Sequence, residues 1–564
     1  MKTFIDPKLV LEDWETLRPY YEALAERTNQ TESEFLQWLK DKSDLDAYIE
    51  EQAAWRYIRM TIDTRDEALT NAYTSFVKDI QPSISLFEDT LNKKMVSSPY
   101  FDLVSNQPGY GIYFRSVLTS IELFRNENVP IEAEINEKSQ HFGSISAAQT
   151  IEHDGEQLTM QKASSLLKEQ DVHLRESIFR KIANRRREDI TKLHDLYSEL
   201  ISLRHKVAVQ AEFENFRDYK FKALGRFDYT KEDCFAFHQA VKEQVVPIVK
   251  EIQLKRLQKL GQQYFRPWDL DVDPGGQKPL KPFTVGGQLL NGTLEIFAKL
   301  DPFFHECLSE MSQRGYLDLE SKTGKAPGGY NYPLYLSGYP FIFMNAVGTQ
   351  QDLVTMVHEG GHAVHSVLSS TLELTAFKNL TSEVAELASM SMELLSMPHW
   401  DVFYKNSQDL NRAKKDQLES IIKILPWIAQ IDAFQHWVYE HPTHSVEQRN
   451  SKWLDLSIDF GTGLIDWTGF EDIQEVGWQR QLHLFEVPFY YIEYGIAQLG
   501  ALGVWKNAME NRNRALDQYK NALRLGYSVS IPEVYQTAGV QFDFTSNHIG
   551  SLMSFVKEQL ELLD

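Results

Sequence analysis

Two histidines four positions apart, with a glutamate directly after the first, constrain this 564-residue chain more than any other feature. They are His358, Glu359 and His362, and they lie in a run punctuated by apolar residues from 353 to 365. Residues i and i+4 lie one above the other on an α-helix, so both imidazoles can bind one tetrahedral cation. Glu359 is turned about 100° from His358. It can therefore serve as a general base for an attacking water without occupying the metal. Two histidines on an ordinary helix remain the alternative.

A third metal ligand must come from elsewhere in the sequence. In one group of zinc hydrolases it is a histidine ten residues after the first, but that position is Leu368. The other source is a glutamate on a second helix, and residues 381–395 have high helix propensity. This run carries three acids near one face: Glu383, Glu386 and Glu393. Acids on an otherwise apolar helix need a partner if they are buried, and a cation would supply one. A solvent-exposed helix face is the alternative.

Taken together, these residues resemble the thimet oligopeptidase and oligoendopeptidase F family of zinc metallopeptidases. The likeness is carried by His-Glu-Gly-Gly-His-Ala-Val-His at 358–365 and by Glu-Leu-Ala-Ser at 386–389, followed by Glu393. The resemblance implies one zinc ion per chain, a general base, and three ligands; the base is Glu359 and the ligands are His358, His362 and Glu386.

The chain departs from the family pattern at Gly360, where family members usually have an aromatic or aliphatic residue. A small side chain there does not touch the chemistry. Two adjacent glycines, Gly360 and Gly361, nevertheless lower helix propensity by about 1 kcal/mol each. We therefore expect this helix to depend on packing and on zinc for its stability.

The segment before the motif resembles the strand and glycine-rich loop that precede the catalytic helix in the family. The loop covers residues 323–330, and residues 340–345 are predicted to be a strand from residue preference alone, ended by Val-Gly-Thr at 347–349. In such peptidases this strand lies at the sheet edge beside the metal, where its free N–H and C=O groups can pair with a peptide. We expect substrate contacts from Phe341, Ile342, Phe343, Met344, Gly328, Gly329 and Tyr330.

A later segment, residues 483–500, resembles the histidine- and tyrosine-bearing segment of the family. Hydrolysis through an oxyanion needs donors aimed at the developing negative charge, and imidazole N–H and phenol O–H groups are suitable. His483 and Tyr494 are the first candidates. Tyr490 aligns with Tyr494 at i+4, whereas Tyr491 reproduces a three-residue spacing found in part of the family, so both stay open. Each tyrosine alone could instead be an aromatic residue that packs its ring and exposes its hydroxyl.

The organisation of the chain is predicted to be mainly α. Residues 1–200 read as a mostly helical N-terminal lobe with one hairpin signal, centred on His-Asp-Gly at 153–155. Residues 201–564 read as the zinc metallopeptidase catalytic domain, with a small β-sheet beside the zinc-binding helix. The resemblance implies two helical lobes around a deep catalytic cleft or channel, in a zincin-like fold with glutamate as the third ligand.

Composition excludes several classes of function. The formal charge of −22 opposes nucleic-acid binding, which relies on lysine and arginine. No stretch approaches the roughly 18 uncharged apolar residues of a membrane span. The two cysteines, Cys234 and Cys307, provide no disulfide framework. We therefore expect a cytoplasmic protein without nucleic-acid or membrane partners, and the sequence does not fix its oligomeric state.

The resemblance implies hydrolysis of internal bonds in short unstructured peptides, because family members enclose the zinc between lobes that folded proteins cannot enter. The sequence of residues 488–494 most resembles the Pz-peptidase branch of the family. This resemblance implies acceptance of collagen-like peptides rich in proline and glycine. A zinc exopeptidase remains possible and would need a charged anchor such as Arg314 or Lys325. A helical peptide-binding protein with structural zinc also remains, with His365 as the nearest fourth ligand. His365 lies too far along the helix axis to join the histidine pair comfortably.

Overall fold

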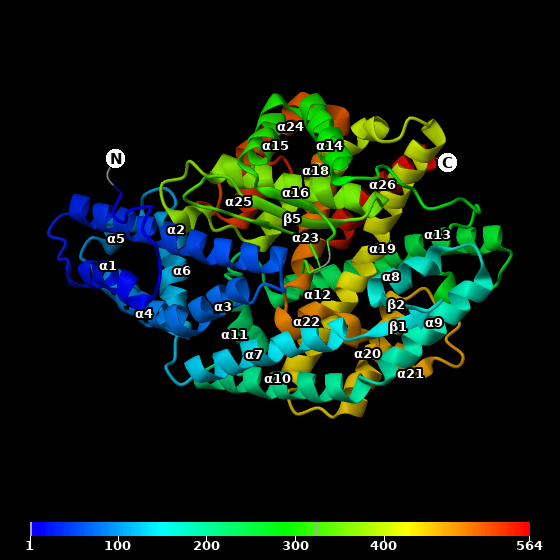
Figure 1. Ribbon diagram of the computed structural model, residues 1–564, viewed down its shortest axis with the longest axis horizontal. Helices are drawn as coiled ribbons and strands as arrows, with labels where there is room; N and C mark the ends of the chain where they lie inside the picture. The colour runs from blue at the N-terminus through cyan, green and yellow to red at the C-terminus, as the bar shows by residue number, and fades with distance from the viewer. Residues whose placement is uncertain (1–2, 323, 327, 564) are drawn as a thin grey trace. The chain divides into compact units, whose positions relative to one another are not determined.

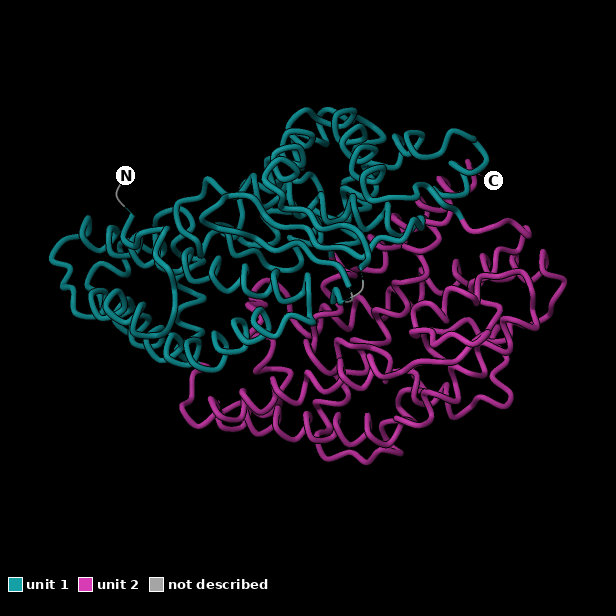
Figure 2. Tube along the Cα trace, in the orientation of Figure 1, with its two compact units in different colours: residues 1–122, 280–414, 497–542 teal, residues 123–279, 415–496, 543–564 magenta. Residues whose placement is uncertain are grey.

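The computed structural model describes residues 3–322, 324–326 and 328–563. Thr323 and Pro327, which belong to the glycine-rich loop expected from the sequence, lie outside the described residues. The chain forms two compact units, each assembled from separate segments (Figure 2). Unit 1 comprises residues up to 122, 280–414 and 497–542, and unit 2 comprises residues 123–279, 415–496 and those from 543 onward.

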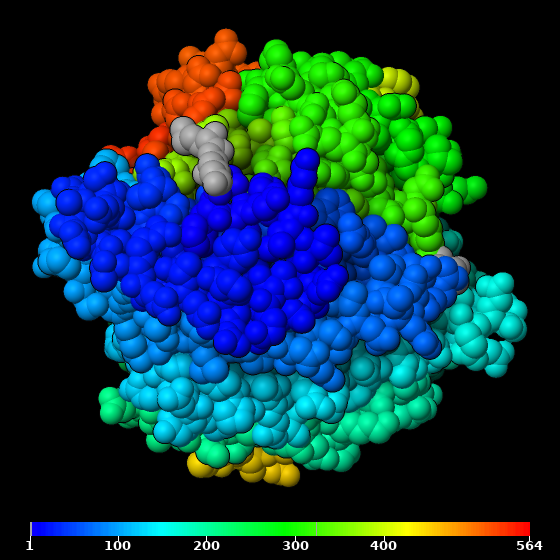
Figure 3. Space-filling model, turned by 60° about the vertical axis from the view of Figure 1, so that its left-hand side comes forward, coloured from blue at the N-terminus to red at the C-terminus, as the bar shows by residue number. Residues whose placement is uncertain are grey.

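These units differ from the contiguous division at residue 200 that the sequence suggested. The N-terminal helices pack on much later parts of unit 1. Ser43 accepts a hydrogen bond from the backbone N–H of Thr375 at 2.7 Å, and the Glu51 carboxylate accepts one from Leu336 N–H, also at 2.7 Å. In Figure 3 the N-terminal helices, in blue, lie against the green segment of the same unit. Tertiary packing, which sequence order does not reveal, therefore sets the division.

Unit 1 is mainly α, as predicted, with one small sheet (Figure 1). It contains the helices α1 (Trp14–Glu26), α2 (Glu32–Ile62), α3 (Glu67–Ser75), α4 (Gln81–Val96), α5 (Phe101–Ser105), α6 (Tyr110–Leu123), α14 (Gly286–Leu300), α15 (Pro302–Arg314), α16 (Gln350–Ser369), α17 (Thr375–Lys378), α18 (Ser382–Ser396), α24 (Arg512–Leu523) and α25 (Ile531–Thr537). Its strands are β3 (Leu317–Glu320), β4 (Tyr330–Tyr332) and β5 (Phe341–Ala346).

The strand predicted at residues 340–345 exists as β5, but its expected place at the sheet edge was wrong. The strand order is β3-β5-β4, with β3 parallel and β4 antiparallel to β5. Ile342 pairs with Leu317 on one side and with Asn331 on the other, so neighbouring strands flank β5 on both sides. Phe341, Ile342, Phe343 and Met344 are all buried. An apolar strand buried on both faces belongs in the middle of a sheet, and β3 and β4 are the strands at its two edges.

The turn from β5 into α16 explains where α16, the helix that carries His358 and His362, begins. Gly348 has a φ of +96°, which favours glycine, and a Cβ there would lie 2.8 Å from the carbonyl oxygen of Phe283. Thr349 then caps the helix in a reciprocal capping box: its hydroxyl accepts from the Asp352 N–H, and the Asp352 carboxylate accepts from the Thr349 N–H at 2.8 Å. The predicted Val-Gly-Thr strand end is thus also the start of the helix.

Unit 2 is also helical and contains the hairpin predicted from the sequence. It contains the helices α7 (Val129–Ala147), α8 (Met160–Ser165), α9 (Val172–Arg187), α10 (Ile190–Gln210), α11 (Phe216–Ala223), α12 (Lys231–Ala240), α13 (Val246–Leu260), α20 (Val446–Phe460), α21 (Glu471–Glu475), α22 (Leu482–Glu486) and α26 (Ser546–Glu561). The strands β1 (Thr150–His153) and β2 (Glu156–Thr159) pair antiparallel, and both turn residues, Asp154 and Gly155, have positive φ as this type of tight hairpin turn requires.

Two long helices belong to both units along the chain. Helix α19 (Ser407–Glu440) starts in unit 1 and continues in unit 2, and α23 (Tyr491–Glu510) starts in unit 2 and continues in unit 1. Among the described residues, no helix combines the length and the apolar character needed to cross a membrane.

Candidate active site

Helices α16 and α18 bring together the three side chains that were predicted from the sequence to be metal ligands. Glu386 Oε2 lies 3.4 Å from His358 Nε2 and 3.9 Å from His362 Nε2. The three ligand atoms all lie within 4.8 Å of one another. Four ligands bound tetrahedrally to zinc at 2.0–2.2 Å lie about 3.3–3.6 Å apart. Two imidazoles and one carboxylate at this separation therefore fit a zinc ion.

Glu393, two turns beyond Glu386 on α18, orients the first histidine. Its Oε1 lies 2.7 Å from His358 Nδ1, which leaves Nε2 facing Glu386. Burial by itself would lower the pKa of His358, but the hydrogen bond to Glu393 and the charges of both glutamates raise that pKa to about 10. Both glutamates are buried, so the solvent-exposed face considered for Glu386 is excluded. The cluster thus favours positive charge at its centre.

Glu359 is a buried carboxyl group next to this cluster. Its Oε2 has no hydrogen-bond partner among the described residues. Burial raises the pKa of Glu359 to about 7, with the other glutamates adding to the effect and His358 opposing it. Its backbone carbonyl accepts a hydrogen bond from the Asn331 side chain of β4 at 3.3 Å, which ties the sheet to the helix. A carboxyl group with a pKa near neutrality is suited to taking up and releasing a proton.

The glycine pair in α16 has a packing role. A Cβ built on Gly361 would lie 2.6 Å from Ser389 Cα and 2.8 Å from the Ala388 carbonyl oxygen, both backbone atoms of α18. A Cβ on Gly360 would instead meet the ring of Phe297 at 2.5 Å. Gly361 therefore permits the close approach of the two helices that carry the ligand atoms. The packing gained by this approach offsets the low helix propensity of glycine.

His365 does not join the candidate metal group. It is wholly buried on α16, and burial lowers its pKa to about 3, so it is a neutral imidazole at pH 7. The described residues that could hold a cation here are His358, His362 and Glu386, without His365. The structure thus offers no support for His365 as a fourth protein ligand, which a closed structural zinc site would need.

The residues nominated for substrate contact separate into a buried strand and an edge strand. Phe341 to Met344 lie in β5, whereas Gly328 and Gly329 precede the edge strand β4. Tyr330, the first residue of β4, stacks on Phe343 at 4.7 Å, and its hydroxyl hydrogen-bonds with Thr61 Oγ1 at 2.6 Å. The ring of Tyr330 therefore stabilises the sheet, and the backbone of β4 is the part of this segment placed at an edge.

The basic residues considered as exopeptidase anchors both have partners inside unit 1. The side chain of Lys325 is buried and its ammonium group lies 2.8 Å from Asp318 Oδ1 and over the ring of Phe343. Arg314 pairs with Glu310 at 2.8 Å on the surface of α15. Neither side chain is placed as an unengaged anchor for a peptide terminus.

Unit 2 brings the predicted histidine and tyrosines into one aromatic cluster. The ring of His483 lies 6.0 Å from that of Tyr490, 4.8 Å from that of Tyr491 and 5.8 Å from that of Tyr494. Tyr494 is close to both other tyrosines, at 5.3 and 5.5 Å. The segment therefore folds as one group, and ring distances do not distinguish Tyr490 from Tyr491.

A constrained turn sets the direction of these tyrosines. Phe489, directly before them, is buried with a φ of +68°, a conformation that costs a bulky residue roughly 1–2 kcal/mol. Its N–H donates to Gln435 Oε1 at 2.6 Å, and its carbonyl oxygen accepts from Arg226. Arg226 in turn pairs with the buried Glu493 at 2.8 Å. These contacts hold the backbone in a strained conformation at the point where the aromatic cluster begins.

Sequence reasoning missed a pair of residues that orient His483. The indole N–H of Trp427 donates to Gln481 Oε1 at 2.9 Å, which fixes the side-chain amide so that its nitrogen faces His483 Nδ1 at 2.6 Å. An amide nitrogen only donates, so Nδ1 accepts and the hydrogen of the neutral ring lies on Nε2. Burial lowers the pKa of His483 to about 4, which keeps this neutral form at pH 7. Nothing in the local sequence pattern identifies this relay.

Comparison with known proteins locates the chain among peptidases. The profile of Peptidase family M3 matches residues 165–553, and that of the Peptidase M3 N-terminal domain matches residues 4–124. An Oligoendopeptidase F homolog of Borreliella burgdorferi is 26% identical over 222 residues, which cover 38% of this chain and 36% of that protein. Oligopeptidase PepF of Bacillus subtilis is 26% identical over 261 residues, 45% of this chain and 37% of that protein. The aligned segments thus span little more than a third of these two relatives.

Solved structures match over the whole chain. The structure of Pz peptidase A with inhibitor 2 superposes with a TM-score of 0.92 at 25% identity and covers 100% of both chains. Oligoendopeptidase-F from Enterococcus faecium superposes with a TM-score of 0.67 at 16% identity, covers 98% of this chain and 97% of that one, and shares the fold. These comparisons confirm the family resemblance and the mainly α fold expected from the sequence.

Proposed function

The chain belongs to peptidase family M3, and we propose that it is a zinc-dependent oligoendopeptidase that hydrolyses internal bonds of short unstructured peptides. The observation that carries this proposal is the convergence of His358, His362 and Glu386 around a position flanked by the buried carboxyl group of Glu359. Three protein ligands without a fourth are typical of a catalytic zinc site, which keeps one coordination position for water or substrate.

The proposed reaction assigns a distinct role to each group on α16 and α18. Zinc held by His358, His362 and Glu386 would polarise the scissile carbonyl and lower the pKa of a water. Glu359 takes a proton from the attacking water and transfers it to the leaving amine, a role that suits a pKa of about 7. Glu393 holds His358 through the Nδ1 contact at 2.7 Å, so that Nε2 faces the ligand position.

We assign oxyanion stabilisation to His483 and Tyr494. The relay through Gln481 leaves the Nε2–H of His483 as a donor, and a phenol O–H provides a second. Tyr490 and Tyr491 both lie against His483 and are proposed as supporting residues of the same cluster.

The edge strand β4 replaces β5 as the proposed partner for substrate backbone. Both sides of β5 are occupied by neighbouring strands, whereas β4 pairs only with β5 in the described sheet. The Asn331 side chain of β4 contacts the backbone carbonyl of Glu359, so β4 lies beside the helix that carries the base. An extended peptide paired with β4 would bind mainly through main-chain hydrogen bonds, which suits a broad range of sequences.

Two further points concern substrate and location. We propose peptides rich in proline and glycine as preferred substrates, as the resemblance to the Pz-peptidase branch implies; the chain superposes on Pz peptidase A over its whole length. Assay of such peptides against proline-free peptides of equal length tests this, and equal rates would contradict it. Two cysteines, both buried and free, accord with the reducing cytoplasm that we propose as the compartment.

The decisive test pairs metal analysis with cleavage of a peptide blocked at both termini. Wild-type protein is expected to bind zinc and cut the blocked peptide internally. Glu359→Gln removes the base but none of the three ligands, so it should keep its zinc and lose roughly a thousandfold in rate. Zinc-loaded wild-type protein that cuts only peptides with free termini would instead support the exopeptidase alternative. Protein that cuts neither kind would support a peptide-binding role.

A further inference from the structure

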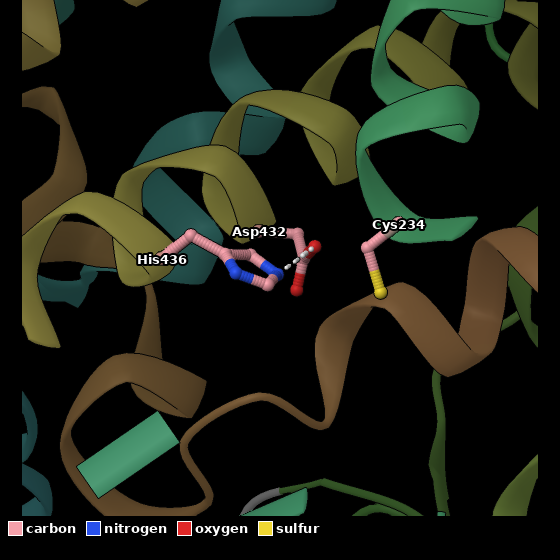
Figure 4. Close-up of side chains that lie close together, drawn as sticks. All are labelled: Cys234, Asp432 and His436. Atoms are coloured by element: carbon pink, nitrogen blue, oxygen red, sulfur yellow. Dashed lines mark ion pairs between the residues drawn. The ribbon is translucent and has the colours of Figure 1, made fainter. Parts of the chain in front are cut away.

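A second group of side chains that could hold a metal ion lies in unit 2, away from any motif singled out in the sequence. Cys234 on α12 and the pair Asp432 and His436 on α19 place one ligand atom each within 4.8 Å of one another. Figure 4 shows the three side chains converging from the two helices, with the ion pair between Asp432 and His436 dashed. All three residues are at least 98% buried.

A second histidine faces the same carboxylate. His238, one turn after Cys234 on α12, places Nε2 2.8 Å from Asp432 Oδ2, and His436 places its own Nε2 3.2 Å from that oxygen. His238 thus holds the Asp432 carboxylate, while the ligand atoms close enough to share one cation belong to Cys234, Asp432 and His436. Thiolate, carboxylate and imidazole are all ligands that zinc accepts.

The hydrogen bonding within this group is incomplete. Asp432 Oδ1 and His436 Nδ1 are wholly buried and have no hydrogen-bond partner among the described residues. A carboxyl group with one unsatisfied oxygen is uncommon at such depth unless a cation accompanies it.

We propose that Cys234, Asp432 and His436 form a second, buried binding site for a divalent cation of the zinc class, and that His238 holds Asp432 in place through their hydrogen bond. Charge balance favours this composition, because a thiolate and a carboxylate together neutralise one Zn²⁺ while the imidazole of His436 binds as a neutral ligand. On binding, the Cys234 thiol gives up its proton to solvent and the sulfur forms a bond to the metal; no oxidant or reductant takes part. The cysteine ligand and the depth of all three side chains favour a structural role for this site, unlike the group on α16 and α18.

The consequence of such a site lies in the turn that begins the aromatic cluster. The ring of His436 packs against Phe489 at 5.4 Å, and the neighbouring Gln435 accepts the hydrogen bond from the Phe489 N–H. A cation that joins α12 to α19 would fix the position of His436 and Gln435, and so stabilise the strained conformation of Phe489 that they contact. The site therefore stabilises the segment that carries Tyr490 and Tyr491 without contacting substrate.

The experiment uses the full-length chain with His358→Ala and His362→Ala, which removes the other candidate metal group. After dialysis this double variant is expected to retain about one zinc per chain, against about two for the wild type. Loaded with Co²⁺, it should show a thiolate-to-cobalt charge-transfer absorption, because the only cysteines in the chain are Cys234 and Cys307. Adding Cys307→Ser, the matched buried cysteine of unit 1, should leave zinc content and absorption unchanged, whereas adding Cys234→Ser should abolish both.

The outcomes separate this site from the proposed peptidase site. A double variant that keeps no zinc and shows no thiolate absorption with Co²⁺ overturns the proposal, even if the wild type is an active zinc peptidase. Absorption that disappears with Cys307→Ser also overturns it. If Cys234→Ser fails to fold, the Cys307→Ser variant still tests the proposal. Cys234 is then the one cysteine left in the chain, so a thiolate-to-cobalt absorption in that variant must come from Cys234.

Discussion

Gly361→Ala is expected to push apart the two helices that carry the proposed zinc ligands. The added Cβ would lie 2.6 Å from Ser389 Cα, about 0.8 Å closer than the 3.4 Å at which ordinary van der Waals contact begins. The atoms it meets in α18 are backbone, so relief requires movement of the helix itself. Overpacking of this kind costs about 1–3 kcal/mol, and alanine regains about 1 kcal/mol of helix propensity. The free energy of unfolding should therefore fall by roughly 0–2 kcal/mol.

Zinc affinity should fall as well. Metal–ligand distances tolerate only about ±0.2 Å, and a shift of α18 by several tenths of an ångström moves Glu386 relative to His358 and His362. We expect the zinc dissociation constant of Gly361→Ala to rise at least tenfold, which corresponds to a loss of about 1.4 kcal/mol in binding free energy. Competition with a chromophoric chelator measures this constant.

Two glycine variants serve as controls for this prediction. In Gly360→Ala the Cβ meets the far end of the Phe297 ring, which can move without displacing α18, so zinc binding should change less. In Gly287→Ala, on α14, the added Cβ meets no atom within 4 Å, and zinc binding should be unchanged. Wild-type zinc affinity in Gly361→Ala, or a larger loss in Gly360→Ala, would refute the argument that Gly361 sets the spacing of the ligands.

Three further outcomes follow from the contacts described above. Glu393→Leu removes the hydrogen bond to His358 Nδ1 and should weaken zinc binding by about 10- to 100-fold; chelator competition measures this, and unchanged affinity would contradict it. Gln481→Leu removes the donor that fixes the tautomer of His483 and should lower kcat by about 3- to 10-fold, the worth of one hydrogen bond, with zinc content unchanged; a change in KM alone would argue against the relay. Removing metal with a chelator should abolish peptide hydrolysis and lower the unfolding temperature, and Zn²⁺ should restore both; full activity in metal-free protein would exclude the proposed mechanism.

Local patterns predicted the elements of the site well. The i, i+4 spacing of His358 and His362 requires a helix, and the structure has that helix as α16. The acidic stripe on 381–395 predicted a second helix with a buried charge partner, and α18 buries Glu386 beside both histidines. The spacing from Glu386 to Glu393 also placed both on one face. That spacing was the signal for the role of Glu393, which the sequence analysis left unassigned.

Long-range pairing was less accessible. Residues 341–344 are apolar and rich in strand-forming types, which identifies a strand but does not say whether it has one neighbour or two. The edge position expected for β5 was wrong because β3 and β4 flank it on both sides. The relay from Trp427 to His483 and the group around Asp432 join residues far apart in the chain, and no periodicity connects them.

The sequence by itself thus determined the helical character of the chain, the hairpin turn at Asp154, and the helix that presents His358 and His362, because each depends on residues within one or two turns of one another. Only the tertiary structure decided the strand order, the assembly of each unit from separate segments of the chain, the close approach of α18 permitted by Gly361, and the convergence of Cys234 with Asp432. Those features depend on which distant surfaces pack together. That choice is set by the summed burial of many side chains, and no short segment records it.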